Sequence, residues 1–162
     1  MASGPVIIPN KPKLNLFNAT ALLSANPANW RLALVTAAWT PDNGDTGNEV
    51  WADVSANEIA SGNGYPAGGV ALSSVALTMT SGTVKFTSAA AVLTASGGGI
   101  AAWRRGVIYY LGTLNGKVNP LLGHFLGDAT GGAGGTPQDV PTTTNGTTLT
   151  ITPNASGLVA AN

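Results

Sequence analysis

The chain has little of what catalysis and metal binding usually require, since it contains no cysteine and a single histidine. Without cysteine there is no disulfide, no thiolate nucleophile and no cysteine-ligated metal. A single histidine also excludes a multi-histidine metal site within one chain. The sequence therefore offers few groups for nucleophilic, redox or metal chemistry.

Charge is the second scarcity. Only 9% of the 162 residues are Asp, Glu, Lys or Arg, against roughly 25% in a typical soluble domain. Seven basic and seven acidic residues give a formal net charge of zero, and so few cations do not neutralise a nucleic-acid backbone. A net charge near zero also disfavours solubility as a free monomer. We expect no nucleic-acid partner, and a protein that works within an assembly.

Long apolar runs are absent as well. No window holds the 18 consecutive apolar residues of a transmembrane helix. Residues 1–13 lack the charged-then-apolar order of a signal peptide. We therefore expect no membrane partner, and the length predicts one domain.

What the chain does contain is a series of short segments with apolar and polar residues in alternation. In Trp30–Ala38, for example, Trp30, Leu32 and Leu34 share one face, which predicts a strand with that face buried. Strand-like segments are 30–38, 70–80, 83–87, 89–95, 100–111, 120–126 and 142–152. Asn115-Gly116 is typical of a hairpin turn. Seven or eight short strands with turns every ~8–12 residues predict an all-β fold, an antiparallel β-sandwich or jelly-roll-like barrel.

A glycine-rich region near the middle of the chain is predicted to define the fold. Ser55-Ala56-Asn57-Glu58 fits a capping box at the start of a short helical turn. Glycines on both sides of Tyr65 allow positive φ or close backbone approach, so that the Tyr65 ring and hydroxyl anchor a crossing between sheets. The predicted fold-defining loop comprises Ser55, Glu58, Gly64, Tyr65, Gly68 and Gly69.

The first residues are predicted to form an extended N-terminal arm, 1–13, ahead of a single β-sandwich domain, 14–162. Prolines at positions 5, 9 and 12 disfavour a helix. The apolar residues between them require burial, either as a strand added to the chain's own sheet or as an arm docked on a neighbouring subunit. The candidate protein-interface residues of the arm are Pro5, Val6, Ile7, Ile8 and Pro9.

His124 is the one candidate for acid–base or nucleophilic catalysis. No G-x-S-x-G motif precedes it and no other strong base accompanies it. The sequence favours a histidine that lies on a strand with its hydrogen bonds satisfied. We predict no catalytic residue, no cofactor and no enzymatic activity.

A polar loop gathers four acidic residues, Asp42, Asp45, Glu49 and Asp53. Carboxylates in such a loop can wrap Ca²⁺, which needs 6–8 oxygen ligands, but the spacing does not match an EF-hand. A solvated loop is favoured and no metal site is assigned. Trp39 and Trp51 flank the loop, which leaves a carbohydrate-binding β-sandwich as an alternative function.

Several blocks of sequence resemble a family of small structural proteins of tailed bacteriophages. They are Ala38-Trp39-Thr40-Pro41-Asp42, VWADVSANEI at 50–59, GNGYPAGGVAL at 62–72, RGVIYY at 105–110 and LLGHF at 121–125. The resemblance extends from about Leu14 to the end of the chain and rests mainly on the N-E and G-Y-x-A-G-G blocks. Two departures are Trp39, where the family often has tyrosine, and Pro66 after Tyr65.

The resemblance implies a virion part without catalytic residues, most simply a capsid decoration or cement protein. Such a protein binds the major capsid protein on the capsid exterior after assembly in the host cytoplasm, and self-associates as a dimer or trimer on a symmetry axis. A tail, neck or fibre-base component is the alternative within the same class.

Overall fold

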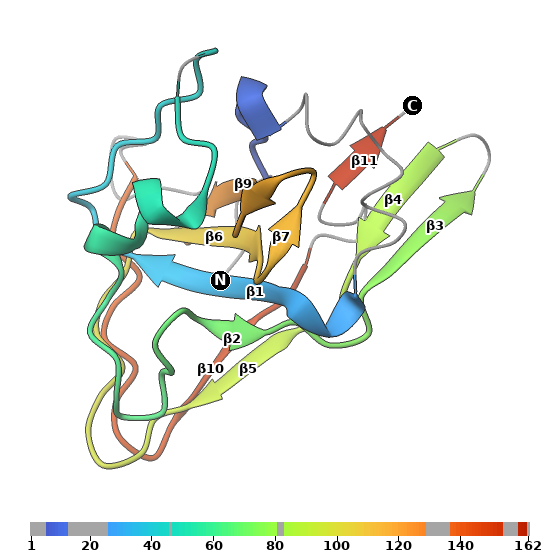
Figure 1. Ribbon diagram of the computed structural model, residues 1–162. Coiled ribbons are helices and arrows are strands. Elements are labelled where there is room, and N and C mark those ends of the chain that lie inside the picture. The colour runs from blue at the N-terminus through green and yellow to red at the C-terminus, as the bar shows by residue number, and fades with distance from the viewer. Residues whose placement is uncertain are drawn as a thin grey trace.

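The computed structural model describes residues 6–12, 26–45, 47–80, 83–128, 137–153 and 159–161. In these ranges the chain consists of short strands in antiparallel sheets, together with single 3-10 turns (Figure 1). The predicted all-β class is confirmed, with eleven strands in the described ranges in place of the seven or eight predicted. Within the same ranges, no helix is long and apolar enough to cross a membrane.

A four-stranded sheet in the order β2-β1-β6-β9 forms the centre of the molecule. Its strands are β1 (Trp30–Val35), β2 (Val70–Ala71), β6 (Arg105–Tyr110) and β9 (Leu121–Leu126). As predicted, β6 and β9 pair antiparallel. Between them, β7 (Thr113–Leu114) and β8 (Lys117–Val118) form a small hairpin. Its turn is the predicted Asn115-Gly116, with φ of 50° and 71°, as a type I′ turn requires.

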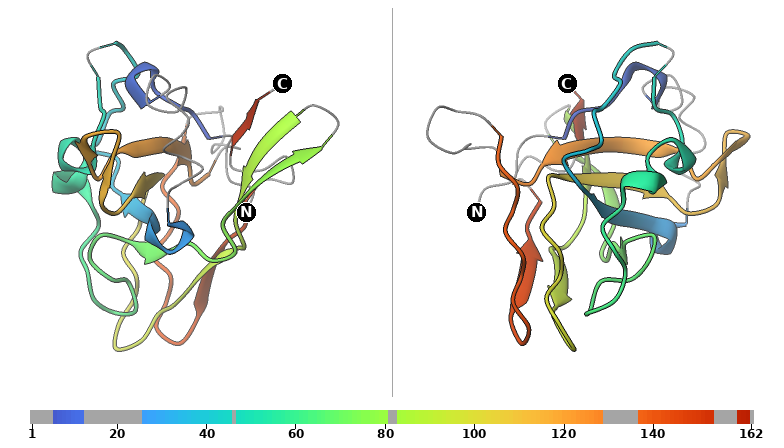
Figure 2. Two further views of the ribbon diagram at one scale, coloured as in Figure 1. Left: turned by 45° about the vertical axis from the view of Figure 1, so that its right-hand side comes forward. Right: turned by 90° about the vertical axis from the view of Figure 1, so that its left-hand side faces the viewer.

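Two smaller sheets extend from this centre in different directions (Figures 1 and 2). One contains β3 (Ala76–Thr80), β4 (Thr83–Thr87) and β11 (Val159–Ala161), in the order β11-β4-β3. The other pairs β5 (Ala91–Thr94) with β10 (Thr148–Ile151). The predicted hairpin of residues 70–80 and 83–87 is confirmed in β3 and β4.

Both faces of the central sheet are buried, whereas the sequence pattern predicted one. The first face carries Trp30, Leu32 and Leu34 of β1 and contributes to the larger hydrophobic cluster. The second face carries Ala33 and Val35 and forms a smaller cluster with Trp39, Trp51, Val54, Val107, Tyr109 and Leu121. Residues beyond the sheet cover this second face, which the alternation within β1 does not reveal.

Besides one helical turn at residues 10–12, the described helical segments are three short 3-10 turns: η1 (Pro27–Asn29), η2 (Trp51–Asp53) and η3 (Ser55–Asn57). The predicted capping box is wrong. Ser55 is the first residue of η3 and not its cap, because Val54 occupies the N-cap position without a side-chain bond. Glu58 is the C-cap residue, and its carboxylate accepts a hydrogen bond from the Tyr65 hydroxyl.

Gly106 lies near the start of β6, and the register shift of this strand against β9 lies further on, between Ile108 and Tyr109. A Cβ atom at position 106 would overlap the ring of Phe125 on β9. The glycine therefore makes room for a side chain of the neighbouring strand.

Candidate interaction site

The described part of the N-terminal arm lies against the outer edge of β9. The Ile7 N–H donates to the His124 carbonyl at 2.6 Å, and the His124 N–H donates to the Ile7 carbonyl at 2.9 Å. This pair is an isolated antiparallel bridge. Of the two placements that the sequence left open, residues 6–9 adopt the one on the chain's own sheet. Pro5 lies outside the described residues, and docking on a neighbour stays a prediction.

Gly123 permits this close approach. A Cβ atom at position 123 would lie 2.6 Å from the Ile7 carbonyl oxygen and 2.8 Å from Cγ1 of Val6. Atoms that are not bonded to each other do not come so close, so any larger residue would push the arm away from β9. The missing side chain of Gly123 therefore allows the arm backbone to contact β9 directly.

The arm is extended only as far as Pro9, which corrects the prediction of an extended segment through residue 13. Residues 10–12 are helical. Pro12 fits because the first N–H groups of a helix have no partner within the helix and a proline there loses nothing. Pro9 and Pro12 are fully buried, whereas Ile7 is 43% exposed. The prolines therefore fasten the arm, and Ile7 presents an apolar side chain to solvent.

Asn43 connects the arm to a buried side chain of β9. Its carbonyl oxygen accepts from the Asn10 N–H at 3.2 Å, and its Oδ1 lies 3.0 Å from Nε2 of His124. The His124 ring is 3% exposed and packs edge-on against Trp39, with ring centroids 5.3 Å apart. The expectation of a histidine on a strand with a hydrogen-bond partner is confirmed.

Burial, and to a lesser degree the nearby charge of Arg105, together lower the pKa of His124 to about 4. The imidazole is therefore neutral at neutral pH. Since Oδ1 of Asn43 only accepts, Nε2 carries the proton and donates it. The hydrogen bond from the neutral, buried His124 to Asn43 therefore connects the 42–45 loop to β9.

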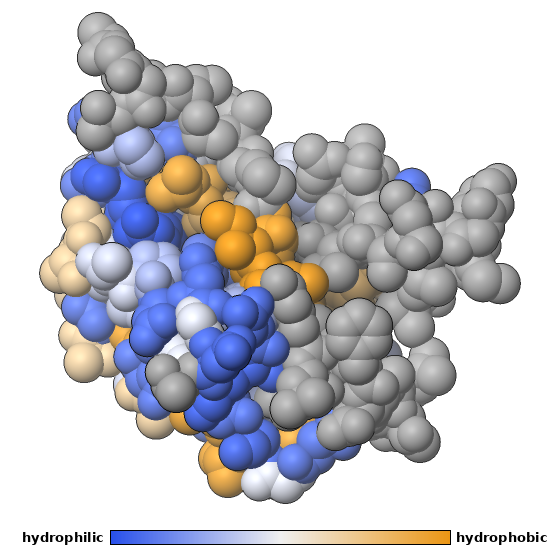
Figure 3. Space-filling view, turned by 90° about the horizontal axis from the view of Figure 1, so that it is seen from above, coloured by the Kyte–Doolittle hydropathy of each residue, from blue (hydrophilic) through white to orange (hydrophobic). Residues whose placement is uncertain are grey.

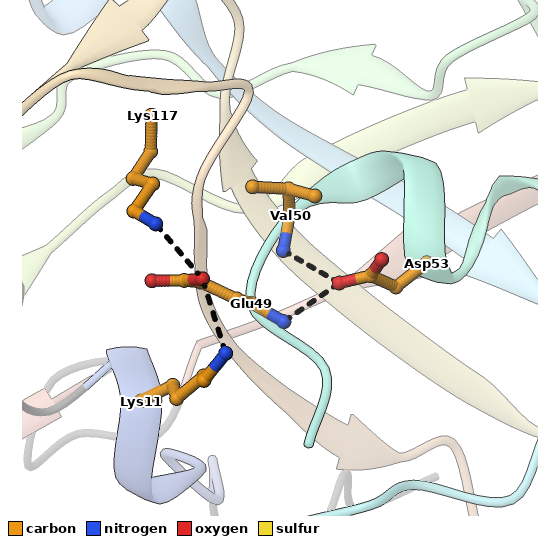
Figure 4. A network of polar contacts seen from close by, with 5 residues as sticks. All are labelled: Lys11, Glu49, Val50, Asp53 and Lys117. Carbon is orange, nitrogen blue, oxygen red and sulfur yellow. Dashed lines mark hydrogen bonds and ion pairs between the residues drawn. The ribbon is translucent and has the colours of Figure 1, made fainter. Parts of the chain in front are cut away.

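Ion pairs connect Glu49, which follows the 42–45 loop, to the arm and to the small β7–β8 hairpin (Figure 4). Oε2 of Glu49 lies 3.5 Å from Nζ of Lys11 and 3.2 Å from Nζ of Lys117. The lysine side chains are 38% and 44% exposed, so each pair contributes little stability. Their effect is to join three segments that are distant in the sequence.

The four acidic residues of the loop act separately. Oδ2 of Asp53 accepts from the backbone N–H groups of Glu49 and Val50 at 2.9 and 3.1 Å, as Figure 4 shows. Oδ1 of Asp45 accepts from the Asn10 amide, and Oδ1 of Asp42 accepts from the Gly44 N–H. Among the described residues, no three His, Asp or Glu side chains converge in a group able to hold a metal ion.

The glycine-rich region lies away from the arm and carries its own buried polar link. The Tyr65 hydroxyl accepts from the Leu34 N–H at 2.9 Å and donates to Oε1 of Glu58 at 2.7 Å. Burial raises the pKa of Tyr65, and the bond to Glu58 adds to this effect. At Gly64 and Gly69 a Cβ atom would overlap the carbonyls of Thr94 and Leu32, respectively. Tyr65 thereby ties the loop to β1, and the glycines allow the close contact.

The tryptophans flanking the acidic loop do not form a paired sugar-binding surface. Trp39 is 4% exposed, and its carbonyl oxygen accepts from Nη1 of Arg105 at 2.9 Å. The carbohydrate alternative relied on exposed rings of both tryptophans. The buried Trp39 ring cannot contact a sugar at the surface. Trp51 is partly exposed and stacks on Tyr109 with centroids 4.7 Å apart.

Seen from above, the described surface is largely hydrophilic, with hydrophobic atoms gathered toward its middle (Figure 3). Over the described residues, the exposed large hydrophobic side chains come from separate elements: Ile7, Val92, Leu111 and Val118. Ile7 is the one that belongs to the arm.

Sequence reasoning missed the residues that join the arm, the 42–49 segment and the small hairpin: Asn10, Lys11, Asn43, Lys117 and Gly123. Each is an ordinary polar or small residue in its local sequence. Their roles arise from contacts between segments far apart in the chain, and periodicity carries no signal for such contacts.

Comparison of the chain with models of protein families, with curated proteins and with solved structures found no match.

Proposed function

We propose that the chain is a structural protein of a tailed-bacteriophage virion, a decoration or cement protein that binds the major capsid protein and stabilises the head. Two things support this proposal. One is the resemblance carried by the motifs at 50–59 and 62–72. The other, which carries it, is the arm seated on the edge of β9 through backbone hydrogen bonds.

An arm that pairs with a strand edge suits an assembly. Backbone pairing of this kind adds an extended segment to an exposed sheet edge and depends little on the identity of the side chains. The exposed Ile7 on the arm offers an apolar contact to a neighbouring chain. Repetition of a modest contact over symmetric sites gives high overall affinity without strong charge, in keeping with the 9% charged residues.

The first test is deletion of residues 2–12, followed by binding of the purified protein to empty capsids of the phage that encodes it. We expect the deletion to abolish binding, whereas a full-length Val92→Ala variant, altered on β5 away from the arm, binds as the wild type does. Unchanged affinity and capsid stability after the deletion would contradict a role for the arm.

The second test is the copy number in purified particles, measured by quantitative gel densitometry or a reconstruction. A decoration protein is present in hundreds of copies on the shell. The low copy number of a ring points instead to the neck, tail or fibre base. Absence from the particle would overturn the whole proposal.

A further inference from the structure

A hollow of about 510 Å³ opens on the second face of the central sheet, on the far side of Tyr109 from the arm-binding edge. It lies where η2 and the 66–71 turn approach β1 and β6, on the side of the molecule shown in the right panel of Figure 2. The volume falls in the range of small-molecule sites. The arm-binding edge of β9 contributes no residue to its lining.

The floor of the hollow is one row across three strands. Arg31 of β1 pairs in register with Ala71 on one side and Tyr109 on the other. Residues paired this way project from the same face of a sheet. Ala71 fills little space beside the long arginine side chain, and this leaves the floor open.

The walls are fixed independently of any ligand. The Tyr109 hydroxyl donates to the Gly68 carbonyl at 2.7 Å and holds the 66–71 turn. Trp51 stacks on the Tyr109 ring with an interplanar angle of 4°, and the backbone N–H of Trp51 donates to the backbone carbonyl of Asn119 at 2.8 Å. A pocket built in advance binds without an ordering cost.

Arg31 has the one charged side chain in the lining, and within the described ranges its guanidinium makes no hydrogen bond or ion pair. Glu58, whose charge also acts on Tyr109, is held by Tyr65 and does not pair with Arg31. The rest of the lining is mostly apolar or backbone, and its apolar side chains are Trp51, Pro66, Ala67, Val70, Ala71 and Leu111. The hollow thus combines a single unpaired cation with an aromatic plane.

We propose that this hollow binds a small carboxylate with a flat apolar body, such as an aromatic carboxylic acid. The guanidinium matches a carboxylate through two parallel hydrogen bonds. The single positive charge of Arg31 neutralises a carboxylate monoanion, whereas it would neutralise only half of the charge of a phosphate dianion. The mostly apolar lining favours a flat apolar body over a polyhydroxylated sugar, which needs many polar partners.

The probe pair is phenylacetate and its uncharged counterpart, phenylacetamide, each titrated into the full-length protein. The readout is the ¹H–¹⁵N signal of the Trp51 indole, identified by its loss in Trp51→Phe. We expect phenylacetate to shift this signal saturably and to bind about tenfold or more tightly than phenylacetamide. Arg31→Gln removes that preference. Lys85→Gln, which deletes the same charge on β4 outside the hollow, keeps it.

Three results would overturn the proposal. They are equal binding of the acid and the amide, no shift of the Trp51 signal, or a preference that survives in Arg31→Gln. Tighter binding of glucuronate than of phenylacetate would contradict the part of the proposal that gives the ligand a flat apolar body. Since the acid and amide are compared on the unaltered protein, the test stands even where a variant folds poorly.

Discussion

The two faces of the central sheet are buried by different means. Strands and segments from the smaller sheets cover the first face, where Trp30 packs edge-on against Phe86 and Tyr110 with centroids 5.0 and 5.3 Å away. The second face is covered by residues of the 36–57 segment, which contains η2 and η3 and supplies Trp39, Trp51 and Val54.

Polar features gather on the second face. His124, Arg31 and the Trp51–Tyr109 stack all belong to it. The first face belongs to the larger hydrophobic cluster and the second face to the smaller one. The second face carries the hollow beside Arg31 and Tyr109, because turns tolerate polar groups and gaps that strand packing excludes.

The sharpest test compares one buried leucine from each face. Leu34 is fully buried on the first face and Leu121 is 5% exposed on the second. We expect Leu34→Ala to lower the free energy of unfolding by about 3–5 kcal/mol and Leu121→Ala by about 2–3 kcal/mol, because turns collapse into a cavity more readily than strands. Urea denaturation measures both values. Equal losses would contradict the difference between the faces.

The second prediction concerns pH. The pKa of His124 is about 4 in the folded protein and about 6.5 in an unfolded chain. The unfolded state therefore binds more protons below pH 6.5, and stability falls as the pH drops from about 6.5 toward 4. We expect a loss of about 2–3 kcal/mol across this window, measured by urea denaturation at each pH.

The control for the pH prediction is His124→Gln, which keeps an N–H donor and does not titrate. His124 is the one histidine of the chain, so the variant should lose most of the slope between pH 6.5 and 5. The same slope in both proteins would show that the second face does not bury a titrating group.

The third prediction sets two tyrosine hydroxyls against each other. Tyr65→Phe removes the acceptor of the buried Leu34 N–H and should cost about 2 kcal/mol. Tyr109→Phe removes a donor to the half-buried Gly68 carbonyl, which water then reaches, and should cost about 1 kcal/mol or less. Thermal unfolding of the two variants gives the comparison, and a reversed order would contradict it.

The fourth prediction isolates the arm. Gly123→Ala places a methyl group against Ile7 and Val6 and should cost about 1 kcal/mol by displacing the arm. In a protein that lacks residues 2–12 the same substitution should cost almost nothing, because its partner is gone. Urea denaturation measures the cost of Gly123→Ala in the full-length and in the arm-deleted protein, and limited proteolysis shows whether the arm is displaced. An equal loss of stability in both proteins would mean that the added methyl group clashes with something other than the arm.

The smallest effect belongs to the ion pairs. Lys11→Gln and Lys117→Gln each remove one exposed partner of Glu49 and should cost about 0.5 kcal/mol or less at low salt, vanishing at high salt. Denaturation at two salt concentrations measures this. A cost above about 1 kcal/mol that persists at high salt would mean that these pairs carry the arm.

Much of the fold could be predicted because it depends on short-range patterns. Alternation in Trp30–Ala38 predicts β1, and Asn115-Gly116 marks the turn between β7 and β8 where the structure has it. The hairpin of β3 and β4 follows from the same reasoning.

The sites could not be predicted, because they depend on contacts across the chain. Arg31 is an outward residue of an alternating strand by pattern, and only the register with Tyr109 gives it an aromatic neighbour. Ser55 and Glu58 fit a capping box, yet Glu58 bonds with Tyr65 because the 62–65 turn brings that hydroxyl to β1. Such pairings follow from tertiary packing, which overrides a local motif.

The bridge between Ile7 and His124 has a consequence for how the protein is made. The arm leaves the ribosome before the strand that holds it, which is synthesised more than a hundred residues later. At ~5–20 residues per second, the arm waits for roughly ten seconds without its own strand. During this time the backbone N–H and carbonyl groups of Ile7 lack the partners that His124 later supplies.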